Sequence, residues 1–156
     1  MNISFKTAGP EYLKTLVELR IEFVKELHPE ISDDTLNKSR KPTEIYFRDL
    51  LEKELYTGFL GLSPENDIIC TAGLLIYDLP PLESEYCRKI GHILNFYTKP
   101  KYRKKGFGTA LMEFIKTSSK ESGINRLFLN ATDMGLGLYQ KAGFTDPCCR
   151  AMVYDL

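Results

Sequence analysis

A basic segment that contains two glycines lies between an apolar strand pattern at residues 91–98 and an amphipathic helix pattern. The segment reads Arg103, Lys104, Lys105, Gly106, Phe107, Gly108 and Thr109. The first turn of a helix has backbone N–H groups without intrahelical partners and lies at the positive end of the helix dipole. Successive amides at 104–109 can therefore converge on phosphate oxygens, and glycine keeps side chains out of their way. We predict a phosphate-binding loop at this junction.

The order Arg-x-x-Gly-x-Gly separates this loop from two common phosphate-binding motifs. A Walker loop needs Lys followed by Ser or Thr after its last glycine, whereas Gly108 is followed by Thr109 and Ala110. A dinucleotide-binding fold places Gly-x-Gly-x-x-Gly after its first strand, with an acidic residue about twenty positions further on. Neither pattern is present. An isolated basic run is usually a solvated loop, but the glycine spacing and the strand-to-helix position favour phosphate contact.

Two segments resemble hallmarks of the GNAT superfamily of N-acetyltransferases. Residues 103–108 are similar to its Gln/Arg-x-x-Gly-x-Gly/Ala signature, and residues 95–113 are similar to the surrounding strand, loop and helix. Residues 138–144, Leu-Tyr-Gln-Lys-Ala-Gly-Phe, resemble its second hallmark, Leu-Tyr-x-Lys-x-Gly-Phe. The motifs occur in the family's order and spacing, and residues 93–103 and 131–139 look like a group of small bacterial members. The resemblance implies an enzyme that holds the pyrophosphate of acetyl-coenzyme A (acetyl-CoA) on this loop.

Hydrophobic periodicity and turn residues predict an α/β order of elements. Strands are expected at residues 3–7, 56–62, 68–77, 91–98 and 126–130, with one or two more at the carboxyl end. Helices are expected at residues 9–27, 42–55, 107–123 and 134–141, separated by a polar loop at 32–34 and a longer loop at 78–89. The stripe of the first helix is Leu13, Leu16, Val17, Arg20, Val24 and Leu27.

The resemblance implies more about the fold than periodicity does. It implies the GNAT acyl-CoA N-acyltransferase fold, an α+β domain over residues 1–156 with about four helices around a mixed, mostly antiparallel sheet. Strands four and five, 91–98 and 126–130, would be parallel and splay apart at one end, where the pantetheine arm enters. The implied coenzyme-binding residues are Phe96, Tyr97, Thr98, Arg103, Lys104, Lys105, Gly106, Phe107, Gly108, Thr109, Asn130, Gly135 and Tyr139.

The implied reaction is direct transfer of an acetyl group to a primary amine in a ternary complex. It needs an uncharged amine, a hydrogen bond to the developing oxyanion and a proton for the leaving thiolate. The resemblance places Tyr139 beside the coenzyme sulfur as the proton donor, with simple packing under the coenzyme as the alternative. A backbone amide near Phe96 or Tyr97 would hold the oxyanion, and Asn95 would orient the substrate or water. Gly135 fits either a close approach to the coenzyme arm or an irregular turn.

The general base is left open by the sequence. Family members often use a carboxylate, but strand four offers only His92 and Asn95, and strand five offers Asn130. A hydrogen-bonded strand histidine is commoner than a catalytic one. The remaining alternatives are Glu22, Glu26, His28 and bulk water.

Composition favours one domain that needs no metal or disulfide. The chain has 156 residues, 43% of them apolar, and a formal net charge of zero, so it lacks the basic face that nucleic-acid binding needs. No export signal is visible and the most apolar stretch, 68–77, is far shorter than the ~20 residues of a membrane span. We expect a cytoplasmic enzyme whose four cysteines are thiols, the adjacent Cys148 and Cys149 included; a homodimer is left open.

Two other classes of function are compatible with parts of the sequence. A coenzyme-binding sensor of the same fold, without turnover, would explain why strand four has no carboxylate. A nucleic-acid-binding domain using Lys99 to Lys105 is disfavoured by the balanced charge. The acceptor amine, whether a small molecule or a peptide, is not identified by any motif.

Overall fold

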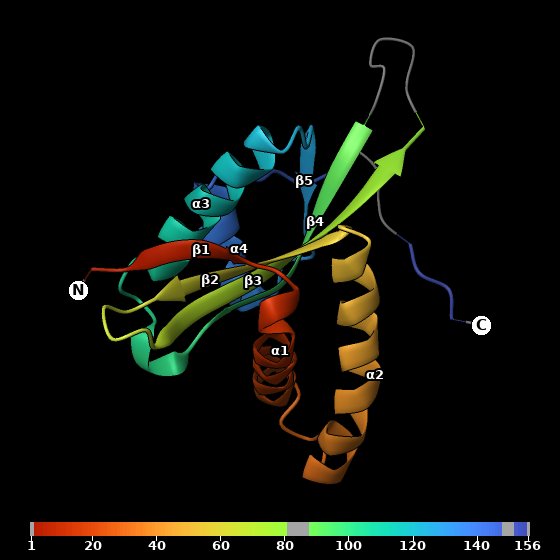
Figure 1. Ribbon diagram of the computed structural model, residues 1–156. Helices are drawn as coiled ribbons and strands as arrows, with labels where there is room; N and C mark the ends of the chain where they lie inside the picture. Colours follow the sequence, from red (N-terminus) through yellow and green to blue (C-terminus); the bar gives the residue numbers. More distant parts are fainter. Residues whose placement is uncertain (1, 81–87, 148–151, 156) are drawn as a thin grey trace.

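One mixed sheet with helices on both faces forms the protein. The computed structural model describes residues 2–80, 88–147 and 152–155. The strands, in sheet order, are β1 (Ser4–Ala8), β2 (Tyr56–Leu62), β3 (Ile68–Leu79), β4 (Arg88–Thr98) and β5 (Arg126–Phe128). The helices are α1 (Leu13–Leu27), α2 (Asp33–Glu52), α3 (Phe107–Glu121) and α4 (Asp133–Lys141), with short 3-10 turns at Pro10–Tyr12 and Pro100–Tyr102. Figure 1 shows α1 and α2 on one face of the sheet, and α3 and α4 on the other.

The last two strands pair over a short distance and then separate. The pairs β1–β2, β2–β3 and β3–β4 are antiparallel, whereas β4 and β5 run parallel. Their recorded pairing joins residues 90–92 to residues 126–128. Strand β4 continues to Thr98 beyond this pairing, and the two strands diverge (Figure 1). The predicted fold, with a splayed parallel pair at positions four and five, is confirmed.

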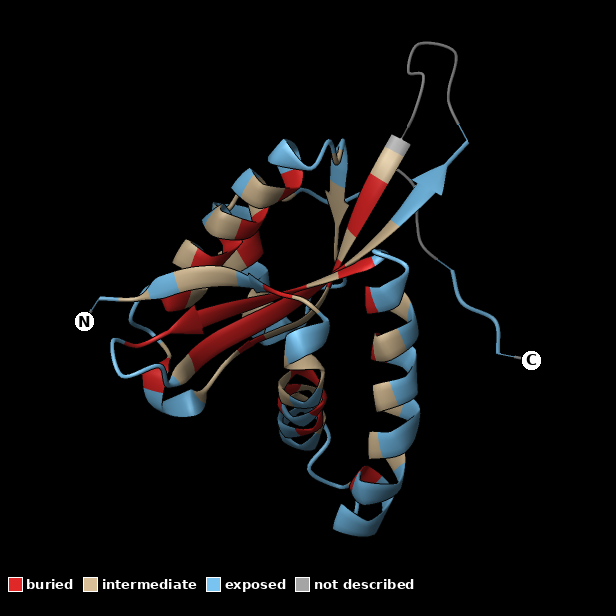
Figure 2. Cartoon of the chain, viewed as in Figure 1, coloured by how far each residue is buried: buried red, intermediate tan, exposed pale blue. Residues whose placement is uncertain are grey.

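Two hydrophobic clusters fix the sheet between its helices. The cluster under α3 contains Phe59, Ile69, Leu111, Met112 and Ile115, and the cluster under α1 and α2 contains Leu16, Val17, Phe47, Leu51 and Leu60. Figure 2 shows β2 and β3 as the most continuously buried strands. Burying such a side chain stabilises the fold by about 1.5–3 kcal/mol. The central strands therefore form a rigid support for β4, which carries most of the candidate site.

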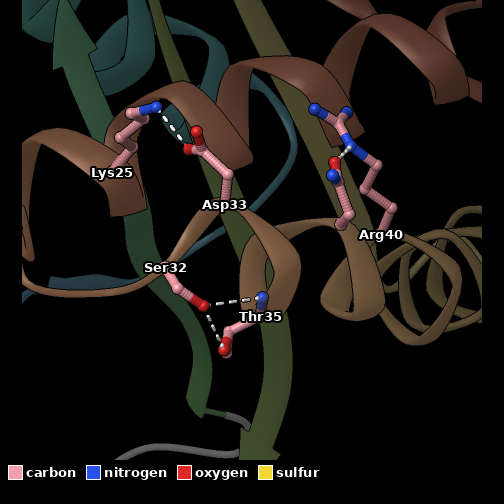
Figure 3. Close-up of polar contacts among 6 residues, drawn as sticks. Lys25, Ser32, Asp33, Thr35 and Arg40 are labelled. Atoms are coloured by element: carbon pink, nitrogen blue, oxygen red, sulfur yellow. Dashed lines mark hydrogen bonds and ion pairs between the residues drawn. The ribbon is translucent and has the colours of Figure 1, made fainter.

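Helix α2 begins earlier than the sequence predicts. It starts at Asp33, not at Pro42, and Pro42 lies inside it. Ser32 is its N-cap: Ser32 Oγ accepts a hydrogen bond from the Thr35 amide at 3.2 Å, and Asp33 pairs with Lys25 of α1 (Figure 3). The prediction was wrong because serine and aspartate, read as loop residues, also cap a helix and complement its dipole. The additional turns extend α2 along α1.

The strands next to the predicted loop are longer than expected, and strands predicted at the carboxyl end are not found. Strands β3 and β4 both extend into the predicted loop 78–89, of which residues 81–87 lie outside the described part. The predicted final strands are not found in residues 142–147 or 152–155, the parts of the carboxyl end that the structure describes.

In the described part of the chain, no helix is long and apolar enough to span a membrane.

Cys70 is a buried free thiol, as predicted. Burial raises the pKa of the Cys70 thiol to about 12, which keeps it protonated and unreactive. The predictions for Cys87, Cys148 and Cys149 concern residues outside the described part.

Candidate functional site

The start of α3 presents backbone amides that have no acceptor among the residues that the structure describes. Gly106 is the N-cap of α3 and has φ +82°, and Lys104 has φ +57°. Ala110 is the first residue of this turn whose amide donates to a backbone carbonyl, that of Gly106, at 3.0 Å. Within the described residues, the amides at 104–109 therefore lack partners. Positive φ angles and unpartnered amides at a helix start are what an anion-binding nest requires.

Gly108 lies where the first turn of α3 approaches both β4 and α4. A Cβ atom at Gly108 would stand 2.9 Å from Leu138 Cδ1 and 3.5 Å from Thr98 Oγ1. Glycine is therefore needed here for close packing, because a side chain would press on Leu138 beside the unpartnered amides. Phe107, in contrast, has its side chain buried in the core.

The side chain of Arg103 fixes the loop to β4 and α1. Its Nε donates to the Thr98 carbonyl at 2.8 Å, and its guanidinium pairs with Glu26 of α1. Tyr97 OH donates to the same Glu26 carboxylate at 3.3 Å, and burial raises the pKa of Tyr97 to about 12. Lys105 Nζ donates to the Lys101 carbonyl at 3.1 Å. Among the predicted side-chain cations, Lys104 is exposed and has no recorded partner in the described structure.

Tyr139 lies on the α3 and α4 face, against β4. Its ring packs edge-on against Phe96 at 5.7 Å and against Phe144 at 6.1 Å between centroids. Burial raises the pKa of the Tyr139 phenol above its ordinary value, so the phenol keeps its proton at neutral pH. A Cβ atom at Gly135 would stand 2.7 Å from the Tyr139 ring. Gly135 thus makes room for Tyr139.

A β-bulge in β4 turns Asn95 toward the face of the sheet that α1 and α2 cover, opposite to the face that carries Tyr139. Thr71 of β3 pairs with Tyr97 but Gly73 pairs with Leu94, so β4 carries one more residue than β3 across this interval. Asn95 has φ +53°, which asparagine tolerates better than most residues. The bulge brings Leu94 and Asn95 to the same pocket, while Phe96 faces the cluster around Tyr139.

Asn95 is clamped by two side chains from other elements. Arg20 Nη1 of α1 donates to Asn95 Oδ1 at 2.8 Å, and Asn95 Nδ2 donates to the Tyr56 hydroxyl at 3.4 Å. A guanidinium has no acceptor atom, so this contact also fixes which way the amide points. A Cβ atom at Gly73 would stand 1.8 Å from the Tyr56 hydroxyl oxygen, so only glycine there lets Tyr56 lie across β3 and reach Asn95.

The pocket beside the bulge has a volume of about 340 Å³. It is lined by Arg20, Pro42, Thr43, Tyr46, Phe47, Leu94 and Asn95. Helices α1 and α2 therefore form its walls, and β4 forms its floor. Because residues 94–96 of β4 contact this pocket on one face and Tyr139 on the other, the bulge joins the two halves of the candidate site.

The predicted alternatives for a general base do not line this pocket. Glu26 is paired with Arg103, and Glu22 with Lys99 at 3.3 Å. His28 Nδ1 lies 3.1 Å from Glu30 at the exposed end of α1. His92 Nε2 is buried without a partner, its ring packs against Phe128, and burial lowers its pKa. Asn130 is exposed beyond the end of β5.

Three residues that line the pocket or hold Asn95 in place belong to no motif in the sequence. Arg20, Tyr56 and Tyr46 were not recognised as candidates, although Arg20 gave a visible signal: it is a cation in the otherwise apolar stripe of the first helix. No comparable signal marks Tyr56, whose reach depends on Gly73 across the sheet, or Tyr46, which lines the pocket together with Pro42 and Thr43.

Known proteins of similar sequence are acetyltransferases. The family model described as "Acetyltransferase (GNAT) family" matches residues 14–144. Over 81 residues the chain is 31% identical to glucosamine 6-phosphate N-acetyltransferase of Trypanosoma brucei brucei, a match that covers 52% of this chain and 53% of that protein. The chain thus spans about half the length of this curated relative.

Two solved structures of acetyltransferases are similar in fold to this protein over nearly the whole chain. A predicted acetyltransferase from Clostridium acetobutylicum, crystallised with acetyl-CoA, is 25% identical with a TM-score of 0.83, over 98% of this chain and 96% of that one. A GCN5-related N-acetyltransferase from Ralstonia eutropha is also 25% identical, with a TM-score of 0.81 over 98% of this chain and 99% of that one. Because the family model matches residues 14–144, most of the chain, the protein belongs to the acetyltransferase (GNAT) family.

Proposed function

We propose that this protein transfers the acetyl group of acetyl-CoA directly to the primary amine of a small molecule or peptide. The observation that carries the proposal is the group of unpartnered amides at 104–109, beside the end of β4 where it has left β5. Gly108 keeps side-chain atoms away from the same place, where a Cβ atom would stand 2.9 Å from Leu138 Cδ1. These features fit a long ligand with phosphates at one end and a narrow arm at the other.

The residues of the loop and of β4 would bind the coenzyme. Bound acetyl-CoA supplies an acetyl group activated as a thioester. The amides at 104–109, together with the charges of Lys104 and Lys105, would hold its phosphates. Arg103 would act by holding the loop against Thr98 and α1. The backbone at 96–98 would pair with the pantetheine arm as another strand would, with Asn130 at the facing strand end.

Tyr139 and Asn95 are proposed as the residues that act at the reacting atoms. The buried phenol of Tyr139 holds a proton at its hydroxyl oxygen for the leaving sulfur. Asn95, held by Arg20 and Tyr56, orients the amine or a water molecule from the pocket side. The described residues that line the pocket include no carboxylate or imidazole, and we propose that the amine loses its proton to water.

A coenzyme-binding sensor is the second candidate function. The pocket favours it, because its lining, as far as the structure describes it, has no acid or imidazole and would suit binding without turnover. Both functions require the coenzyme, so binding tests the shared part and release of free thiol in the presence of amines separates them.

Acetyl-CoA should raise the melting temperature of the protein. A ligand that binds only the folded state at one hundred times its Kd stabilises it by about 2.7 kcal/mol, which corresponds to roughly 5–10 °C for a chain of this size. Adenosine, which lacks the phosphates for the amides at 104–109, should have much less effect. Differential scanning calorimetry gives the measurement. An unchanged melting temperature at saturating acetyl-CoA would contradict both candidate functions.

A further inference from the structure

We propose that the acceptor is a small amine that also carries an anionic group, and that Arg20 binds this anion in the pocket beside Asn95. The proposal rests on the proposed acetyl transfer and adds the chemical class of its acceptor. It follows from the charge, the burial and the partners of one side chain.

Arg20 has no acidic partner in the described part of the chain. It is partly buried and lines the pocket, where its recorded contacts are the hydrogen bond to Asn95 and the Phe23 ring, 5.7 Å from Arg20 Cζ. Among the residues that the structure describes, no acidic side chain pairs with it. Other arginines on or against these helices do have such partners: Arg40 pairs with Glu18, Arg48 with Glu44, and Arg103 with Glu26.

An unpaired, partly buried cation is costly for the free protein. Burial lowers the pKa of Arg20, which shows that desolvation outweighs the local charges, yet a guanidinium stays protonated at any physiological pH. A guanidinium has five N–H donors, and the recorded hydrogen bond to Asn95 uses one of its nitrogens. A carboxylate or phosphate from a ligand would use the others in the forked geometry that makes such pairs strong.

The rest of the pocket limits the size of the acceptor. A volume of about 340 Å³ is at the small end of the roughly 300–1,000 Å³ of ligand pockets, which favours one small molecule over a polypeptide. Pro42, Phe47 and Leu94 provide apolar walls for a short carbon skeleton. Arg20 touches Asn95, and Asn95 adjoins Phe96 on the coenzyme face. The amine and the anion of the acceptor should therefore be only a few bonds apart.

Matched pairs of acceptors test the proposal. Thiol release from acetyl-CoA is measured with an amino acid against its carboxamide, and with an amino-sugar phosphate against the unphosphorylated amino sugar. In at least one pair, kcat/KM for the anionic member should be about 10- to 100-fold higher, as expected for hydrogen bonds to a charged group. The pair that responds distinguishes a carboxylate from a phosphate. Equal kcat/KM within both pairs would overturn the proposal.

Variants then assign the effect to Arg20. Arg20→Gln should bring the ratio of anionic to neutral kcat/KM close to one, mainly through KM. Arg20→Lys keeps the charge but loses the fork, so it should lower the ratio by less. Arg40→Gln, which removes an α2 cation that pairs with Glu18 and does not line the pocket, should leave the ratio unchanged.

Two outcomes contradict different parts of the account. If Arg20→Gln lowers kcat/KM of both members by the same factor, Arg20 acts only by holding Asn95 and the proposal is wrong. If no member of either pair releases thiol although acetyl-CoA still raises the melting temperature, acetyl transfer to these amines fails, and the inference fails with it.

Discussion

Replacing Tyr139 by phenylalanine should lower the rate of acetyl transfer on the order of 10²-fold and change coenzyme affinity little. The substitution keeps the ring that packs against Phe96 and Phe144 and removes only the hydroxyl group. Because burial raises the pKa of Tyr139 above the usual value of about 10, the wild-type phenol stays protonated through neutral and mildly alkaline pH. The loss should therefore be the same at about pH 7 and about pH 9. Single-turnover kinetics with acetyl-CoA and an identified acceptor give the rates.

The leaving group provides a control for the role of Tyr139. An acyl donor whose thiol has a lower pKa needs less help from an acid, so the defect of Tyr139→Phe should shrink with such a donor. A variant that keeps the full rate on acetyl-CoA would show that Tyr139 only packs against the coenzyme. The thiolate would then leave without a proton or take one from water.

Gly108→Val should raise the Kd for acetyl-CoA roughly 10- to 100-fold, because it adds a branched side chain at the crowded point where β4, α4 and the start of α3 meet. Lys101→Ala removes one exposed charge near the same loop and should change Kd by less than about 5-fold. Titration calorimetry measures both. Equal effects in two folded variants would indicate a diffuse basic patch in place of a backbone cradle.

A double variant separates blocked binding from disturbed packing. A Cβ atom at Gly108 would press on Leu138 Cδ1, so Gly108→Val also strains the contact between α3 and α4. Adding Leu138→Ala should relieve this strain and recover part of the lost melting temperature. Coenzyme affinity should stay low in the double variant, since the valine still covers the backbone. Recovery of affinity together with stability would show that the effect of Gly108→Val is structural.

The position of the glycine-containing loop before α3 could be predicted because its parts are adjacent in the sequence. The basic residues, the two glycines and the apolar stripe of the helix follow one another directly along the chain. The structure places Gly106 as the N-cap of α3. The fold and the family follow from the same motifs and are confirmed. The contacts of the loop's side chains could not be predicted in the same way. Arg103 pairs with Glu26 of α1, which is distant in the sequence and lies near Arg103 only after folding.

The pocket half of the site could not be predicted because it depends on contacts between distant segments. The clamp on Asn95 joins α1, β2 and β4, and it exists only because of a bulge in β4 and the absence of a side chain at Gly73. Neither feature has a local sequence pattern. The start of α2 could not be predicted for a different reason, since Ser32 and the aspartates after it are of types favoured both in loops and at helix starts.

Acetyl transfer itself is tested most directly by following acetyl-CoA and a panel of amines together. The panel contains amino acids, amino sugars, their phosphates and peptides, and the products are free thiol and acetylated amine. We predict that at least one amine releases thiol with an equal amount of its N-acetyl product, and that Tyr139→Phe slows both to the same extent. If acetyl-CoA binds but no amine in the panel accelerates thiol release over the protein alone, the result contradicts the proposed transferase and supports a coenzyme-binding sensor.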